Sequence, residues 1–139
     1  MSALTITAYV DGYDLEEVFA SLELECHRFL VGRTWSTACC LISTHHPKHP
    51  SDHPDDYPQW DFGFNLSISL EKPLQNAVVA DIQSIAAFVA TLHARFSRSF
   101  VFGFFDPRSN TQEDFTFIDN DPSKIDSFIE ILRGSHGSA

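Results

Sequence analysis

Large apolar residues occupy every second position between residues 60 and 70, and this alternation constrains the fold more than any other feature of the chain. The apolar set comprises Trp60, Phe62, Phe64, Leu66, Ile68 and Leu70. Between them stand small or polar residues, namely Asp61, Gly63, Asn65, Ser67 and Ser69. A period of two over this length predicts a long strand with one buried face and one face of small polar groups.

The segment before this strand predicts two more strands with a helix between them. Apolar and polar residues alternate over residues 4–10, which is typical of a half-buried strand. A helix is expected next, because Asp14 stands three residues before Glu17, the spacing of a capping box, and Gly32 supplies a stop. Small and β-branched residues then predict a second strand over residues 34–43.

The segment after the long strand predicts a helix, a hairpin and a final helix. Pro73 and Asn76 introduce a helix, and apolar residues keep helical spacing from Val78 to Phe96. Residues 100–105 are apolar on both faces, which places them inside the sheet, and a hairpin partner follows that ends near Asp119. Asp121 is expected to cap the last helix, with Pro122 in its first turn.

These elements predict an α+β fold with the order β-α-β-β-α-β-β-α. We expect a mainly antiparallel sheet with the helices on one face. The first six elements match a ferredoxin-like core, to which a hairpin strand and a C-terminal helix are added. Residues 1–133 are predicted to form a single domain, and residues 134–139 a tail or a cloning remnant.

The charge of the chain excludes several classes of partner. Nineteen Asp and Glu against nine Lys and Arg give a formal net charge of −10. A chain this acidic repels phosphate backbones and anionic lipid head groups, so neither a nucleic acid nor a membrane is an expected partner. The oligomeric state is left open.

The cysteines and the N-terminal segment point to the cytoplasm. Cys39 and Cys40 are adjacent on a predicted strand and therefore point to opposite faces, which prevents a disulfide between them. We expect buried, reduced thiols, as in cytoplasmic proteins. The first ten residues carry neither the basic region nor the apolar stretch of a signal peptide, and the densest apolar run is strand-sized.

A polar, proline-rich segment over residues 44–59 is predicted to be a long loop or flap. Histidines and aspartates gather in its part 45–56, and imidazole with carboxylate is a ligand set for a divalent metal. The candidate ligands are His45, His49, Asp52 and His53. Prolines prevent the helix that would stack these histidines, so a solvated loop is the favoured interpretation. A metal-binding enzyme or sensor remains the alternative.

No catalytic constellation is complete in the sequence, which favours a protein that is not an enzyme and needs no cofactor. The chain has no Gly-x-Ser-x-Gly elbow and no glycine-rich phosphate loop. Nothing around the cysteines indicates activation by His27 or His93. The aromatic residues Phe115 and Phe117 are expected to pack in the core. The polar sheet face around Asn65, Ser67 and Ser69 leaves a small-ligand module as another alternative.

Acidic residues concentrate near the first predicted helix. Residues 11–25 carry six acids and no base. The apolar stripe of the helix leaves Ala20, Leu24 and Val31 on its opposite side, so that an exposed apolar strip is bordered by glutamates. Such a strip is suited to docking a basic partner.

The segment DFTFIDNDPSKIDSFIEIL combines a Phe-rich strand, an acidic turn and a short capped helix. In this segment, and in its size and acidity, the chain resembles the small immunity proteins that bacteria keep against toxins. The resemblance implies a cytoplasmic protein that binds a basic toxin effector and occludes its active site with carboxylates and aromatic groups. The partner-binding residues expected on this basis, together with the exposed strip, are Glu16, Glu23, Leu24, Asp55, Asp56 and Tyr57.

Overall fold

The computed structural model describes residues 3–11, 15, 17–46, 59–69, 74–106 and 111–135. Within these residues, five strands and three α-helices follow one another in the predicted order. They are β1 (Ala3–Val10), α1 (Phe19–Val31), β2 (Ala38–His46), β3 (Gln59–Ser69), α2 (Asn76–Phe96), β4 (Phe100–Asp106), β5 (Thr111–Ile118) and α3 (Ile125–Ser135), with a 3₁₀ turn, η1 (Pro122–Lys124), leading into α3.

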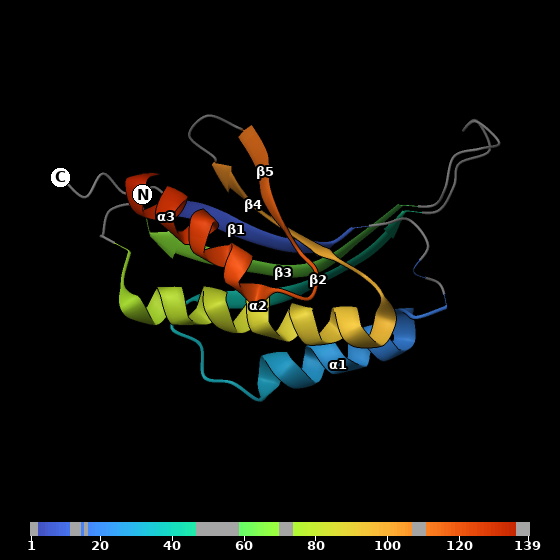
Figure 1. Cartoon of the computed structure of the whole chain (residues 1–139). Helices are drawn as coiled ribbons and strands as arrows, with labels where there is room; N and C mark the ends of the chain where they lie inside the picture. The colour runs from blue at the N-terminus through green and yellow to red at the C-terminus, as the bar shows by residue number, and fades with distance from the viewer. Residues whose placement is uncertain are drawn as a thin grey trace.

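The strands form one sheet in the order β2-β3-β1-β4-β5, and every neighbouring pair is antiparallel (Figure 1). β3 lies between β1 and β2, the two strands that α1 connects. β1 likewise lies between β3 and β4, the two strands that α2 connects. These two interleaved units form the split β-α-β arrangement of the ferredoxin-like core. β5 extends the sheet beyond β4, so the predicted α+β class and the added hairpin strand are confirmed.

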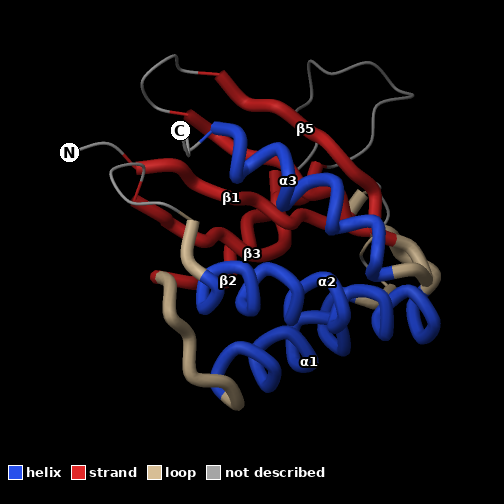
Figure 2. Tube along the Cα trace, turned by 60° about the vertical axis from the view of Figure 1, so that its left-hand side comes forward, coloured by secondary structure: helices blue, strands red, loops and turns tan. Residues whose placement is uncertain are grey.

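All three helices pack on one face of the sheet, which we call the covered face (Figure 2). Phe29 of α1 packs edge-to-face on Phe64 of β3, with ring centroids 5.8 Å apart. Phe128 of α3 makes the same kind of contact with Phe102 of β4, at 6.2 Å. Alternate residues of β1 and β3 complete this face, and all are buried: Leu4, Ile6, Ala8, Val10, Phe62, Phe64, Leu66 and Ile68.

α2 is the central helix of the layer and contacts both α1 and α3. By length and composition it is apolar enough to cross a bilayer. Its position accounts for this character, because a helix with neighbours on both sides and a sheet beneath it buries a wide apolar surface. The buried residues of α2 are Val79, Asp81, Ile82, Ile85, Ala86, Val89 and Leu92.

Two element boundaries differ from those predicted. α1 begins at Phe19, later than the helix expected from Asp14, a residue outside the described part of the chain. Leu15 is buried, but its carbonyl accepts the Val18 N–H in a turn that precedes the helix. β2 begins at Ala38, because the residues just before it donate their backbone N–H groups to a side chain of α2.

The segment predicted as a loop over residues 44–59 is shorter than expected at both ends. β2 continues through residues 44–46, and β3 begins at Gln59. Within this extension His45 pairs with Trp60 across the two strands. At the other end of the chain, α3 continues to Ser135, two residues into the predicted tail.

The prediction that Phe117 packs in the core is wrong. Its side chain is 52% exposed, whereas the neighbouring Ile118 is fully buried opposite Phe100. A register shift between Phe102 and Gly103 separates the two ends of the β4–β5 ladder. Phe117 pairs with Val101 on the side of the sheet away from the helices. The side chain of Phe115 lies outside the described residues.

Candidate functional site

The outer side of α1 carries an apolar strip that faces solvent, as predicted. The predicted residues Ala20, Leu24 and Val31 are all exposed, and the polar His27 lies between the last two; we call these four residues the α1 strip. Their spacing of three and four residues places them on one side of the helix. Leu24 is 50% exposed and Val31 79%. Leu22 and Cys26, on the inner side, are completely buried.

The glutamates near the α1 strip differ in how far they are neutralised. Glu25 lies 3.1 Å from an Arg95 guanidinium nitrogen and 3.6 Å from one of Arg28, so its charge is largely compensated. Glu23 accepts a hydrogen bond from the Ser43 hydroxyl at 3.0 Å. Among the described residues no ion pair involves Glu23, so its carboxylate has no cationic partner there.

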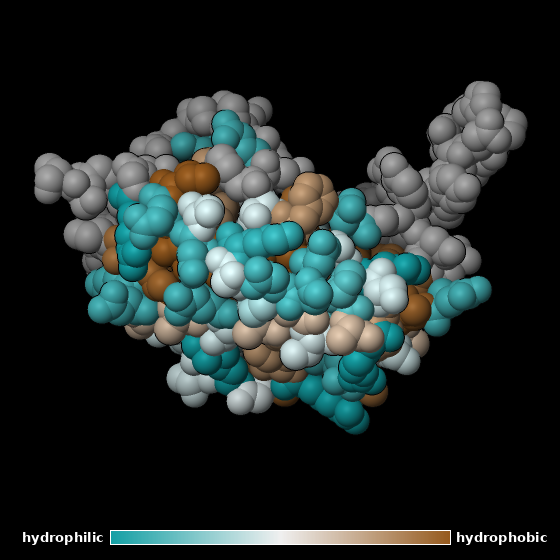
Figure 3. All heavy atoms as spheres, in the orientation of Figure 1, coloured by the Kyte–Doolittle hydropathy of each residue, from teal (hydrophilic) through white to brown (hydrophobic). Residues whose placement is uncertain are grey.

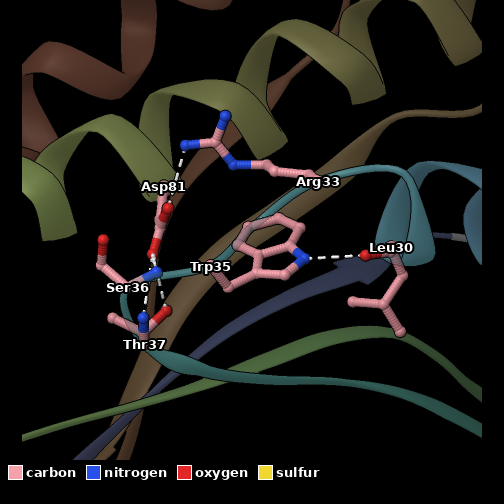
Figure 4. A network of polar contacts seen from close by, with 6 residues as sticks. All are labelled: Leu30, Arg33, Trp35, Ser36, Thr37 and Asp81. Atoms are coloured by element: carbon pink, nitrogen blue, oxygen red, sulfur yellow. Dashed lines mark hydrogen bonds and ion pairs between the residues drawn. The ribbon is translucent and has the colours of Figure 1, made fainter.

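α1 is held in place by a polar network at the segment that leads from it to β2 (Figure 4). Asp81 of α2 is 1% exposed. Its Oδ2 accepts the backbone N–H groups of Ser36 and Thr37, at 2.8 and 3.0 Å, and the Thr37 hydroxyl at 3.0 Å. Its Oδ1 accepts from Arg33 Nη2 at 2.9 Å. One buried carboxylate thus ties the segment to α2 with four hydrogen bonds.

Trp35 supports the same network from the other side of Arg33. The indole Nε1 donates to the Leu30 carbonyl at 2.8 Å, which caps the end of α1. The Arg33 guanidinium lies over the indole ring, with its carbon 5.2 Å from the ring centroid (Figure 4). This stacking is a cation–π contact. The end of α1, which carries Val31 of the α1 strip, is therefore held by the Trp35 indole and by the segment that Asp81 binds.

The sequence interpretation missed Asp81, although a signal for it exists. Asp81 falls three residues after Val78 and four before Ile85, so it lies on the apolar stripe of the predicted helix. A lone carboxylate on such a stripe must find hydrogen-bond donors when it is buried. Its donors lie more than forty residues earlier in the chain, and only the folded chain identifies them.

Two of the predicted partner-binding residues can be placed. Leu24 points to solvent from α1, whereas the carboxylate of Glu23 turns towards β2. Glu16, Asp55, Asp56 and Tyr57 lie outside the described residues. The described part of the predicted site is therefore α1 itself.

The alternative metal site falls largely outside the described residues. His49, Asp52 and His53 are not described, and of His45 only the backbone, on β2, is placed. Within the described part of the chain, no group of three His, Cys, Asp or Glu side chains is arranged to hold a metal ion. The metal-site alternative stays a prediction.

The three cysteines are free thiols, and two of them are poorly suited to nucleophilic chemistry. Burial, reinforced by the Glu25 and Glu23 carboxylates, raises the pKa of Cys26 to about 12. Burial also raises the pKa of Cys39 to about 12, with smaller contributions from Cys40 and Asp81. Cys40 is exposed, which corrects the expectation that all the thiols are buried.

The face of the sheet opposite the helices, which we call the open face, carries the polar residues predicted for it. Ser67 and Ser69 are exposed, and Asn65 is half-buried. The Asn65 side-chain oxygen accepts a hydrogen bond from the Tyr9 hydroxyl at 2.9 Å across β1 and β3. The small-ligand alternative for this face stays a prediction.

Comparison with protein-family models, with curated proteins and with solved structures finds no match to this chain.

Proposed function

We propose that the chain is a non-enzymatic binding protein that docks a basic protein partner on the outer side of α1. The observation that carries the proposal is the exposure of Leu24 and Val31 on a helix whose inner residues Leu22 and Cys26 are completely buried. Exposed apolar groups in a row, rimmed by polar residues, are typical of protein interaction sites.

The partner that fits this surface is positively charged. The chain has a net charge of −10. Glu23 borders the α1 strip without a cationic neighbour among the described residues. Complementary charge accelerates association and excludes partners of the wrong sign. The most specific form of the proposal is an immunity role, in which the protein acts in the cytoplasm and occludes the active site of a basic toxin domain.

The experiment is co-expression of the chain with the product of the neighbouring open reading frame, scored by survival of the host cell. We expect the chain to protect, and Leu24→Asp to abolish protection because a charge would enter the buried centre of the interface. Ile131→Asp is the matched control, because Ile131 is 40% exposed on α3, away from α1. A thermal melt of each variant checks that it folds.

Protection that Leu24→Asp leaves intact would contradict docking on the α1 strip. Absence of protection by the unmodified chain, together with absence of binding to that product, would contradict the immunity role. Binding that does not weaken between low and high salt would contradict recognition by charge, because exposed ion pairs are screened beyond about 8 Å at physiological salt.

A further inference from the structure

A groove runs between the C-terminal half of α1 and the outer side of α2, beside the α1 strip but not part of it. Its volume is about 820 Å³, and it is largely open to solvent. On the surface of these two helices, apolar patches lie between polar residues (Figure 3). The side of α2 that lines it carries Ser84, Ala87, Phe88 and Thr91, which are spaced three and four residues apart.

The wall of the groove is aromatic. Phe29 of α1 and Phe88 of α2 stack face to face, with ring centroids 4.1 Å apart and an interplanar angle of 4°. Both rings are half-buried, so part of each remains accessible. Ala87 is exposed beside them and is small enough to leave the groove unfilled. Such a surface accepts flat apolar side chains.

The charge of the groove is opposite to that of the chain. Arg28 and Arg33 line it, and no acid is among the described residues that line it. Arg28 lies 3.6 Å from Glu25, which Arg95 also contacts at 3.1 Å, so two guanidinium groups share one carboxylate there. The Arg28 side chain is 68% exposed and the Arg33 side chain 30%. The Asp81 carboxylate that holds Arg33 is itself buried, and it engages only one terminal nitrogen of the guanidinium. A positive site on a protein of net charge −10 selects for an anionic group.

We propose that this groove binds an acidic peptide segment that carries aromatic side chains. Carboxylates of the segment pair with Arg28 and Arg33, and an aromatic ring packs on Phe88 beside Ala87. A polypeptide is favoured over a small molecule because the groove is open, whereas small-molecule sites enclose most of their ligand. The site differs in charge and position from the α1 strip, so it does not depend on the function proposed above.

The test is an NMR titration of the ¹⁵N-labelled chain with a random copolymer of glutamate and tyrosine. Polyglutamate supplies charge without rings, and phenyl phosphate is a small aromatic anion. We expect the copolymer to shift amides at residues 28–34 and 84–91, with an affinity at least tenfold above that of either comparison ligand. Raising the salt concentration should weaken the binding.

Two variants separate the aromatic and the charged contributions. Ala87→Trp fills the groove from an exposed position of α2, and it should reduce copolymer affinity at least tenfold. Arg28→Gln removes a guanidinium and should reduce it by about threefold to tenfold. Arg133→Gln is the matched control, because Arg133 is an exposed arginine of α3 that pairs with Glu130 at 2.7 Å, and it should bind as the parent does. Circular dichroism confirms the fold of each variant.

Several outcomes would overturn the proposal. Shifts outside the groove, or copolymer affinity unchanged by Ala87→Trp, would exclude the groove as the binding site. Equal affinity for phenyl phosphate would assign it to a small anion instead, and equal affinity for polyglutamate would remove the role of the rings. Groove shifts that grow with protein concentration, without any added ligand, would assign it to a second copy of the chain.

Discussion

The two faces of the sheet are formed by the same strands but differ in burial. On the covered face Phe64 and Leu66 are completely buried beneath the helices. On the open face Ser67 is exposed, and Asn65 makes its hydrogen bond to Tyr9 within the sheet. Successive side chains of one strand are therefore expected to contribute differently to the free energy of unfolding. We therefore expect the covered face to contribute most of the free energy of unfolding. Substituting residues of each face one at a time tests this expectation.

The largest effect is expected when a buried side chain of the covered face is truncated. Phe64→Ala should lower the free energy of unfolding by about 3–5 kcal/mol, because it removes a buried ring and leaves a cavity against Phe29 and Phe88. Urea denaturation measures the loss. Ser67→Ala, three residues further along the same strand, is the control and should change stability by less than about 0.5 kcal/mol. Similar losses for both variants would contradict the comparison.

Adjacent thiols on opposite faces should differ strongly in reactivity. A rise in the pKa of Cys39 from 9.0 to about 12 lowers its thiolate fraction at pH 8 by about a thousandfold relative to an ordinary thiol. Cys40 is exposed on the open face. Alkylation with iodoacetamide at pH 8, followed by peptide mass spectrometry, should therefore modify Cys40 at least about a hundredfold faster than Cys39. Equal rates in the folded protein would contradict the placement of β2.

The same thiols predict how stability depends on pH in the alkaline range. Folding raises the pKa values of Cys26 and Cys39 from 9.0 to about 12. The folded chain therefore keeps protons that the unfolded chain releases above pH 9. Stability from this source is complete below pH 9 and is lost as the pH rises towards 12. In urea denaturation above pH 9, the free energy of unfolding of the double variant Cys26→Ala/Cys39→Ala should therefore fall less steeply with pH than that of the parent chain.

A smaller loss is expected for the buried carboxylate that joins α2 to the segment before β2. Asp81→Ala removes the acceptor of two backbone N–H groups and of Arg33. We expect about 2–4 kcal/mol of destabilisation, measured by urea denaturation. Glu25→Gln is the control, because its ion pairs are partly exposed, and it should cost about 0–1 kcal/mol. A loss for Asp81→Ala no greater than for Glu25→Gln would show that the network adds little.

The smallest effect is expected on the open face. Tyr9→Phe removes the hydroxyl that donates to Asn65 and should cost about 0.5–1.5 kcal/mol. A double-mutant cycle with Asn65→Ala isolates this hydrogen bond from other effects of each substitution. A coupling energy near zero would mean that the open face contributes nothing specific. A coupling comparable to the loss for Phe64→Ala would remove the contrast between the faces.

Local sequence patterns predicted much of the fold and the exposed apolar residues of the α1 strip. The alternation around Phe64 fixed which residues of β3 face inwards, because the side-chain period of a strand is two whatever its partners are. Helical spacing likewise placed Leu24 on the outer side of α1. The start of α1 was misplaced, because the capping-box spacing of Asp14 and Glu17 is also compatible with a turn ahead of the helix.

Other features depended on contacts between segments that are distant in sequence. Phe117 was expected inside, yet the register shift beside Gly103 leaves Ile118 as the buried residue. Gly63 stands at a polar position of the alternation, where a serine would satisfy the pattern equally well. In the folded chain, a Cβ at this position would lie 2.0 Å from the Ala8 carbonyl oxygen of the neighbouring strand, so only glycine fits.

The sequence by itself determined the element order, the inward sides of β3 and α1 and the acidity of the molecule, since all three follow from residue type and local period. Tertiary structure alone decided which donors surround Asp81, and it brought Arg28 and Arg33 together with Phe88 along one groove. The physical reason is that periodicity orients a side chain relative to its own element, whereas hydrogen bonds and grooves arise from how separate elements are packed. Amino-acid composition therefore does not predict a positive groove on a chain of net charge −10.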